Sequence, residues 1–189
     1  MGIFRRIMQK VIRCIYAPPS KKCFAKIGKN VNFPIFTDIN NPKNVFLGDN
    51  VTFLRTLRLV SLGNNKIVFG SYIGPCLDLA IIAGADVIIE DNVSIAGNVF
   101  ISAGNHGMDP TSGVCYGDQP YVGKKVIIRH NAWLGQNVSI MSGVEVGAYS
   151  IIGTGSVVTK SVPDYSIAVG NPAKVIKRFN HQSKMWEKI

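Results

Sequence analysis

Bulky aliphatic residues recur at every sixth position over a long part of this chain. One uninterrupted series of six spans residues 128–158, and a shorter series comprises Ile89, Ile95 and Ile101. A period of six fits neither an α-helix nor the simple alternation of an ordinary strand. It indicates short identical faces that coil and stack, which is a parallel β-helix. The longer series consists of Ile128, Leu134, Ile140, Val146, Ile152 and Val158.

The residues between these aliphatic positions agree with this interpretation. Small or β-branched residues, such as Val138 and Val144, stand two positions before an aliphatic residue and share its inward face. Asn or Gly often follows three positions after it, as at Asn92 and Asn131, and tolerates the left-handed backbone of a sharp corner. Tyr149 occupies the same corner position and does not fit this rule. One unit buries little, so stability must come from stacking.

The repeat divides the chain into one domain with two extensions. We predict an N-terminal extension over residues 1–26, a β-helix over residues 27–178 and a polar tail over residues 179–189, with short helices at the termini. The repeat is loose before residue 89 and fits poorly over residues 60–72. A chain of 189 residues that is 47% apolar can bury one sizeable core.

The net charge of +10 is concentrated at the N-terminus, where no Asp or Glu precedes Asp38. Apolar residues recur at helical spacing over residues 3–16, among Arg5, Arg6, Lys10 and Arg13, which predicts a basic amphipathic helix. A cap on the open end of the β-helix, or packing on a partner subunit, is the favoured interpretation. Peripheral contact with an anionic membrane is the alternative, and nucleic acid is disfavoured because aromatic residues are not interleaved with the basic ones.

The cysteines and the apolar runs point to a cytoplasmic protein. Cys14, Cys23, Cys76 and Cys115 have no metal-ligand spacing and are too few for a disulfide framework. Reduced thiols are the rule in a cytoplasm. No apolar run is long enough to span a membrane.

The period breaks after Ile101 and resumes at Ile128, which leaves residues 107–127 as an excursion from the coil. Loops of this length inside a compact domain are usually functional or disordered. The excursion follows Asn105 and His106 directly. These two residues are therefore candidates for a functional site.

The hexapeptide run, the Asn-His pair before a long loop, and the tails at 158–163 and 170–176 together resemble the hexapeptide-repeat acyltransferases. The galactoside, maltose and polysaccharide-cluster O-acetyltransferases are the most similar branch. The resemblance covers about residues 27–178. It implies a left-handed parallel β-helix, acetyl-CoA as acyl donor without a metal, and a homotrimer with active sites between subunits. It also implies a saccharide or sugar-nucleotide acceptor.

The resemblance assigns the chemistry to His106. Acetyl transfer to a hydroxyl needs a general base, and histidine suits this role because its ordinary pKa lies near neutrality. The alternative is a loop histidine that caps backbone groups. Asn105 falls at a position expected to face inward, so it is either a structural ladder residue or a residue that orients His106. A backbone N–H from a neighbouring corner is expected to stabilise the oxyanion.

For the acceptor, the resemblance points to residues 74–78, where Cys76 and Asp78 replace the asparagine of the sugar enzymes. Asp78 either accepts hydrogen bonds from sugar hydroxyls or is only a corner residue. For CoA, ammonium groups near the C-terminal coils suit its phosphates. Residues carried over to CoA binding are Trp133, Gln136, Ser142, Thr154, Thr159, Lys160, Lys174 and Lys177.

Other functions fit the chain less well. Xenobiotic acetylation or N-acetylation of an amino sugar stays open, because the same base serves a hydroxyl or an amine. A γ-type carbonic anhydrase needs three converging histidines, and His106, His130 and His181 lack the spacing. A non-catalytic β-helix does not account for the long histidine-bearing loop. Direct transfer is expected, with an acyl intermediate on Cys76 or Cys115 as the alternative.

Overall fold

The computed structural model describes residues 18–189. The predicted amphipathic helix over residues 3–16, with its capping and membrane interpretations, lies outside the described residues. In the described part, a 3-10 turn η1 (Lys21–Cys23) precedes the first strand, and a second 3-10 turn η2 (Pro42–Asn44) follows later. No helix among residues 18–189 combines the length and the apolarity needed to cross a bilayer.

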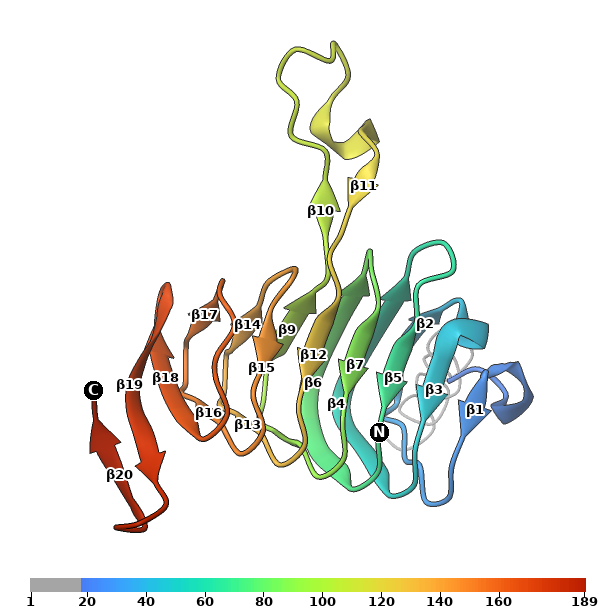
Figure 1. Cartoon of the computed structure of the whole chain (residues 1–189). Helices are drawn as coiled ribbons and strands as arrows, with labels where there is room; N and C mark the ends of the chain where they lie inside the picture. Colours follow the sequence, from blue (N-terminus) through green and yellow to red (C-terminus); the bar gives the residue numbers. More distant parts are fainter. Residues whose placement is uncertain (1–17) are drawn as a thin grey trace, which may run out of the picture.

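The chain winds into a parallel β-helix whose three faces are three sheets (Figure 1). The first sheet comprises β1 (Lys26–Ile27), β3 (Val45–Leu47), β5 (Ile67–Phe69), β7 (Val87–Ile89), β12 (Val126–Ile128) and β15 (Glu145–Val146). The second sheet comprises β8 (Ser94–Ile95), β13 (Trp133–Leu134), β16 (Ile151–Ile152), β18 (Ser166–Gly170), β19 (Ala173–Asn180) and β20 (Met185–Lys188). The third sheet comprises β2 (Phe36–Asn40), β4 (Val51–Ser61), β6 (Ile73–Ala83), β9 (Val99–Ser102), β14 (Ser139–Ile140) and β17 (Val157–Val158). The predicted all-β parallel β-helix is confirmed.

The core is the column of aliphatic side chains that the period of six marks. Ile128, Leu134, Ile140, Val146 and Ile152 are each 0% exposed, and so is Val158 at the end of the series. Equivalent residues of neighbouring coils pair directly, as Ile128 does with Ile89 on one side and Val146 on the other. Burial of this continuous column supplies the main favourable term in folding.

Asparagines at the corners have the left-handed backbone that the sequence predicts, with φ of 58° at Asn92 and Asn131. Tyr149 also has this conformation, with φ of 57°, and so does Tyr165, with φ of 53°. Their rings stack on one another with centroids 5.1 Å apart and planes 4° apart. This stacking, which extends to His130 on one side and His181 on the other, explains why tyrosine is tolerated at two strained corners.

The early coils differ from the later ones, which explains the weak repeat before residue 89. Strands β4 and β6 each have 11 residues and bend at a residue of positive φ, Arg55 (69°) in β4 and Asp78 (56°) in β6. The poorly fitting residues 60–72 include a wide corner. There the buried Ser61 accepts a hydrogen bond from Asn44 Nδ2 at 2.9 Å, and the Asn65 side chain bonds Leu62 O at 2.8 Å.

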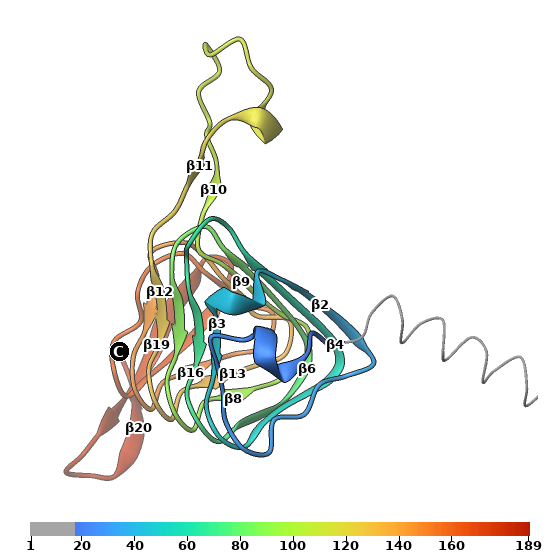
Figure 2. The ribbon, with the colours of Figure 1, turned by 90° about the vertical axis from the view of Figure 1, so that its right-hand side faces the viewer.

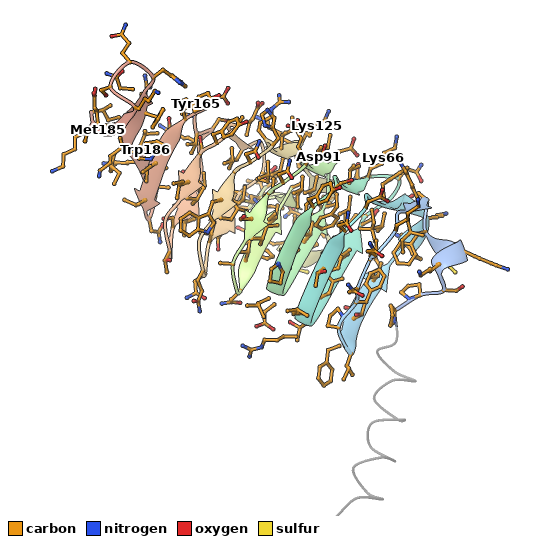
Figure 3. The ribbon with its side chains drawn as sticks, turned by 90° about the horizontal axis from the view of Figure 1, so that it is seen from below. Lys66, Asp91, Lys125, Tyr165, Met185 and Trp186 are labelled. Carbon is orange, nitrogen blue, oxygen red and sulfur yellow. The ribbon has the colours of Figure 1, made fainter. Side chains whose placement is uncertain are left out.

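The C-terminal end is a strand hairpin, so the short helix expected at that terminus is not formed. Strand β19 runs antiparallel to β18, and β20 runs antiparallel to β19. Exposed and half-buried residues alternate along β19, which is the period of a strand with one covered face. Phe179 and Trp186 pack edge to face with centroids 5.4 Å apart, and Figure 3 shows Trp186 beside the C-terminal strands.

Candidate active site

The excursion leaves the β-helix as a two-stranded stalk. Strands β10 (Asn105–His106) and β11 (Tyr121–Val122) pair antiparallel, and the loop beyond them contains the 3-10 turn η3 (Tyr116–Asp118). Viewed nearly along the β-helix axis, the stalk projects from one corner (Figure 2). We call this the loop corner. It joins the third sheet to the first and includes residues 84–86, 123–125, 141–143 and 159–161.

His106 lies at the base of this stalk with an exposed side chain. Its cross-strand partner is Tyr121, and the two rings meet edge to face with centroids 5.1 Å apart. Beside them is a hollow of about 400 Å³ on the outer face of the third sheet. The hollow is lined by Leu62, Ile82, Phe100, Ser102, Asn105, His106, Tyr121 and Met141. An exposed imidazole at a partly apolar hollow can exchange a proton with a bound ligand.

Asn105 does not face inward, so the ladder interpretation of this residue is wrong. Its side chain is exposed on β10, because the chain has already left the coil. The buried position is taken by Ala103, which is 0% exposed. Asn105 lines the same hollow as His106.

Cys76 belongs to the hydrophobic core and is 0% exposed. The prediction that its thiol contacts the acceptor is therefore wrong. Burial raises the pKa of the Cys76 thiol to about 12, so it is neither a nucleophile nor an acyl carrier near neutral pH. Cys115 is exposed on the loop, and its thiol donates a hydrogen bond to Asp118 at 3.0 Å.

Asp78 is a half-buried corner residue whose two carboxylate oxygens both have partners. The Thr56 hydroxyl donates to one oxygen at 2.9 Å, and Arg55 Nε lies 3.2 Å from the other. Asp78 lines a second hollow, of about 350 Å³, together with Asp38, Arg58 and Asn98. Asn98, which lines this hollow, directly precedes β9 of the third sheet, whereas His106 follows the end of β9. In one chain Asp78 and His106 therefore lie toward opposite ends of the strands of that sheet.

Three of the residues predicted to bind CoA share the loop corner with His106. Ser142, Thr159 and Lys160 come from the two coils that follow the loop, and Thr159 and Lys160 are exposed. The Lys124 backbone N–H donates to Ser142 Oγ at 2.9 Å, which ties the returning loop to the next coil. The exposed Lys124 and Lys125 add two cations at this corner that sequence reasoning did not single out.

The other predicted CoA residues lie away from the loop corner. Trp133 is 52% exposed on the second sheet, where it pairs with Ser94 and Ile151. Lys174 and Lys177 lie on β19 of the same sheet. Gln136 and Thr154 are exposed at the corner between the second and third sheets. One chain therefore divides the predicted CoA residues between the loop corner and the second sheet with its border to the third.

The loop has an internal organisation that sequence reasoning missed. Gln119 is 7% exposed, and its Oε1 accepts the Asp109 backbone N–H at 3.0 Å. Its Nε2 donates to Asp109 O at 2.9 Å, Ser112 Oγ at 2.9 Å and Val114 O at 3.2 Å. Hydrogen bonds from Thr111 lower the pKa of Asp109. A single glutamine in a Gly- and Pro-rich segment gives no signal of this role before the loop is folded.

In the described residues 18–189, no three His, Cys, Asp or Glu side chains are grouped as metal ligands. His106 lies on the stalk, whereas His130 and His181 belong to the tyrosine stack at another corner. The three histidines are thus far from a shared centre.

A family model described as bacterial transferase hexapeptide (six repeats) matches residues 117–160. A relative from Escherichia coli K12, WbbJ, is 33% identical in an alignment of 164 positions that covers 84% of this chain and 83% of that protein. The chain belongs to the hexapeptide-repeat transferases. WbbJ is named, provisionally, a lipopolysaccharide biosynthesis O-acetyl transferase.

Other proteins similar to this chain carry acyltransferase names. A galactoside O-acetyltransferase of Lactococcus lactis is 32% identical over 71% of this chain and 63% of its own length. Among solved structures, a mutant of AntD, an N-acyltransferase from Bacillus cereus, has a TM-score of 0.71 and 26% identity, covering 86% of this chain and 88% of that one. That structure holds dTDP-4-amino-4,6-dideoxyglucose and coenzyme A. The names of these relatives confirm the prediction of an acyltransferase.

Proposed function

We propose that this protein is an acetyl-CoA-dependent O-acetyltransferase that acts on a hydroxyl of a saccharide or sugar nucleotide. The observation that carries the proposal is the exposed His106 at the hollow of the loop corner. The O-acetyltransferase names of its relatives and the coenzyme A bound to its structural neighbour support the same reaction.

In the proposed mechanism, the neutral His106 imidazole accepts the proton of the acceptor hydroxyl. The hydroxyl oxygen then attacks the thioester carbonyl, and a backbone N–H of a neighbouring corner stabilises the oxyanion. Collapse of the tetrahedral intermediate breaks the carbon–sulfur bond, and the departing thiolate takes the proton back from His106. Asn105, which lines the same hollow, is assigned to orient His106 or the acceptor.

The proposal includes a homotrimer with the active sites between subunits. The division of candidate residues within one chain supports it. Ser142, Thr159 and Lys160 share the corner of His106, whereas Trp133, Gln136, Thr154, Lys174 and Lys177 lie on the second sheet or at its border with the third. A second copy that brings its second sheet to the loop corner of the first joins the two groups around one CoA. Asp78, which lines the second hollow on the third sheet, is assigned to the acceptor.

A cytoplasmic location is proposed with this activity. Cys23, Cys76 and Cys115 are free thiols in the described chain, as in most cytoplasmic proteins.

N-acylation of a nucleotide-linked amino sugar is the second candidate. The AntD structure with a dTDP-amino sugar favours it, because this chain follows the AntD chain over most of its length. The same imidazole can accept the proton that the nitrogen of a neutral acceptor amine loses as it attacks the thioester. The group that receives the acyl group, a hydroxyl or an amine, therefore distinguishes the two candidate functions.

The test is release of free CoA thiol from acetyl-CoA with a panel of sugars, sugar nucleotides, amino sugars and chloramphenicol. His106→Ala is expected to lower kcat by about 10²–10⁴-fold while CoA still binds. His130→Ala, an exposed histidine at another corner, is the matched control and is expected to retain activity. Unchanged turnover in His106→Ala contradicts the assignment of the base, and turnover with amines alone selects N-acylation.

Lys160→Ala and Lys174→Ala test the CoA assignment separately. Loss of an ammonium group that binds a phosphate is expected to raise the KM for acetyl-CoA with little change in kcat. Lys184→Ala, an exposed lysine in the C-terminal turn, is the control. Cys115→Ser is expected to keep full activity if transfer is direct.

A further inference from the structure

Tyr121 faces His106 across the two strands of the stalk. The two are direct cross-strand partners in the stalk, where facing side chains lie near enough to interact. Their ring planes are inclined by 75°, with centroids 5.1 Å apart. Edge-to-face contact of this kind restricts both rings.

Tyr121 is itself held by the β-helix. Its hydroxyl donates a hydrogen bond to Gly104 O at 2.8 Å. Its ring fills the space above two glycines, Gly84 on the preceding coil and Gly104 at the foot of the stalk. A Cβ added at either glycine would overlap the Tyr121 ring. The tyrosine is therefore a half-buried anchor of the stalk on a rigid scaffold.

His106 has fewer restraints of its own. Within residues 18–189, neither imidazole nitrogen has a hydrogen-bond partner in the chain, so packing against Tyr121 is its principal side-chain restraint there. A catalytic imidazole is effective only when it is held close to its reactive geometry, since a displacement of about 1 Å can cost 10²-fold in rate.

We propose that Tyr121 is a positioning residue, whose ring sets the orientation of the His106 imidazole toward the hollow. This inference rests on the proposed function, in which His106 is the general base. Tyr121 takes the part that an orienting carboxylate has in many catalytic sites, but it acts through ring packing rather than through a hydrogen bond to the imidazole. Gly84 and Gly104 are part of this arrangement because, without side chains, they leave room for the Tyr121 ring.

The experiment compares Tyr121→Phe and Tyr121→Leu with Tyr116→Leu, a control at an exposed tyrosine of the same loop. Tyr121→Phe keeps the ring and loses the hydroxyl anchor, and it is expected to stay within about threefold of the wild-type kcat. Tyr121→Leu is expected to lower kcat by about 10²-fold, with the KM for acetyl-CoA changed less than about twofold. Tyr116→Leu is expected to match the wild type.

A spectroscopic measurement tests the contact independently of turnover. With ¹³C-labelled histidine, the His106 resonance is assigned by its loss in His106→Asn among the three histidines of the chain. The ring of Tyr121 is expected to displace the chemical shift of His106. That displacement should persist in Tyr121→Phe and disappear in Tyr121→Leu.

The outcomes separate the inference from the proposed function. Wild-type kcat in Tyr121→Leu overturns the inference, as does an unmoved His106 resonance. An equal loss of kcat in Tyr121→Phe and Tyr121→Leu also overturns the inference, because the phenyl ring alone then does not preserve kcat. If His106→Ala retains turnover, the assignment of His106 as the base in the proposed function fails, while the resonance still reports whether Tyr121 orients His106.

Discussion

Arg129 Nε lies 2.7 Å from Glu145 Oε1, and Arg129 Nη1 lies 2.8 Å from Glu90 Oε1. The three residues come from three successive coils of the first sheet, whose strands β7, β12 and β15 are neighbours. Glu90 also accepts the His130 backbone N–H at 3.0 Å. The two carboxylates raise the pKa of Arg129. One guanidinium thus ties together the coils before and after the loop.

Arg129→Met is expected to lower the thermal unfolding temperature slightly. The effect should be small because the pairs are solvent-accessible, where screening weakens them, and it should shrink further at high salt. Differential scanning calorimetry at low and high salt measures it. Lys125→Met removes an exposed cation at the other end of β12 and serves as the control. A salt-independent loss would mean that lost packing, rather than charge, is responsible.

Cys76 should make stability fall at alkaline pH. The pKa of the thiol is raised to about 12 in the folded protein, whereas an unfolded thiol titrates near about 8.5. The unfolded state therefore loses this proton first as the pH rises. The free energy of unfolding stays unaffected below the unfolded pKa and decreases above it.

Urea unfolding at about pH 7.5 and about pH 10 measures this effect. The wild type is expected to lose about 2 kcal/mol more than Cys76→Ala over this range, because other titrating groups cancel in the comparison. Thiol labelling of the native protein should modify Cys115 and leave Cys76 unmodified until denaturant is added. Rapid native labelling of Cys76 would contradict its place in the core.

Gln119→Ala is expected to loosen the loop without unfolding the β-helix. Loss of this side chain leaves the Asp109 N–H and two carbonyls of the loop without their protein partner, and each of these part-buried hydrogen bonds contributes about 0.5–1.5 kcal/mol. Hydrogen exchange over residues 107–122 should accelerate, while exchange in the coils stays unchanged. Gln182→Ala, at an exposed glutamine of the C-terminal turn, is the control.

Gln119→Glu refines the same test. A carboxylate can still accept the Asp109 N–H, but it cannot donate to the carbonyls of Asp109 and Val114. It is expected to loosen the loop nearly as much as alanine. Full protection in this variant would show that the accepting contact alone organises the loop.

Gly84→Ala is expected to lower kcat, although Gly84 belongs to a coil before the loop and lies outside the hollow. The added methyl group would overlap the Tyr121 ring, so the ring must move and His106 loses its neighbour. Steady-state kinetics should show a kcat reduction of about tenfold or more with little change in KM. Gly117→Ala in the same loop, where the nearest atom is Cys115 Sγ at 3.9 Å, is the control.

The parts of the fold that repeat were predictable, because a period of six records burial directly. Every aliphatic residue from Ile128 to Val158 in that series is buried as expected. The early coils were not predictable in detail, since β4 and β6 bend at Arg55 and Asp78 and so shift the phase. The C-terminal hairpin was missed because its strands pair outside the repeat.

The candidate site likewise contains residues that the sequence could place and residues that it could not. The break in the repeat predicted that a long loop follows His106, and the structure places His106 at the base of that loop. Asn105 was misplaced because the repeat was extended one step beyond the point where the chain leaves the coil. Cys76 was misplaced because a bulged strand turned it inward. Tyr121 and Gln119 were missed because their roles depend on contacts between residues far apart in the loop, which no local pattern records.

The β-helix resumes after the loop as though nothing had been inserted. Val126 pairs with Val87, and Ile128 with Ile89, so β12 takes the place next to β7 that an uninterrupted coil would take. The scaffold therefore sets no length and no composition for the intervening segment beyond the two strands of its stalk. Exchange of the loop tip for one of another length or composition should therefore leave the register of every coil intact.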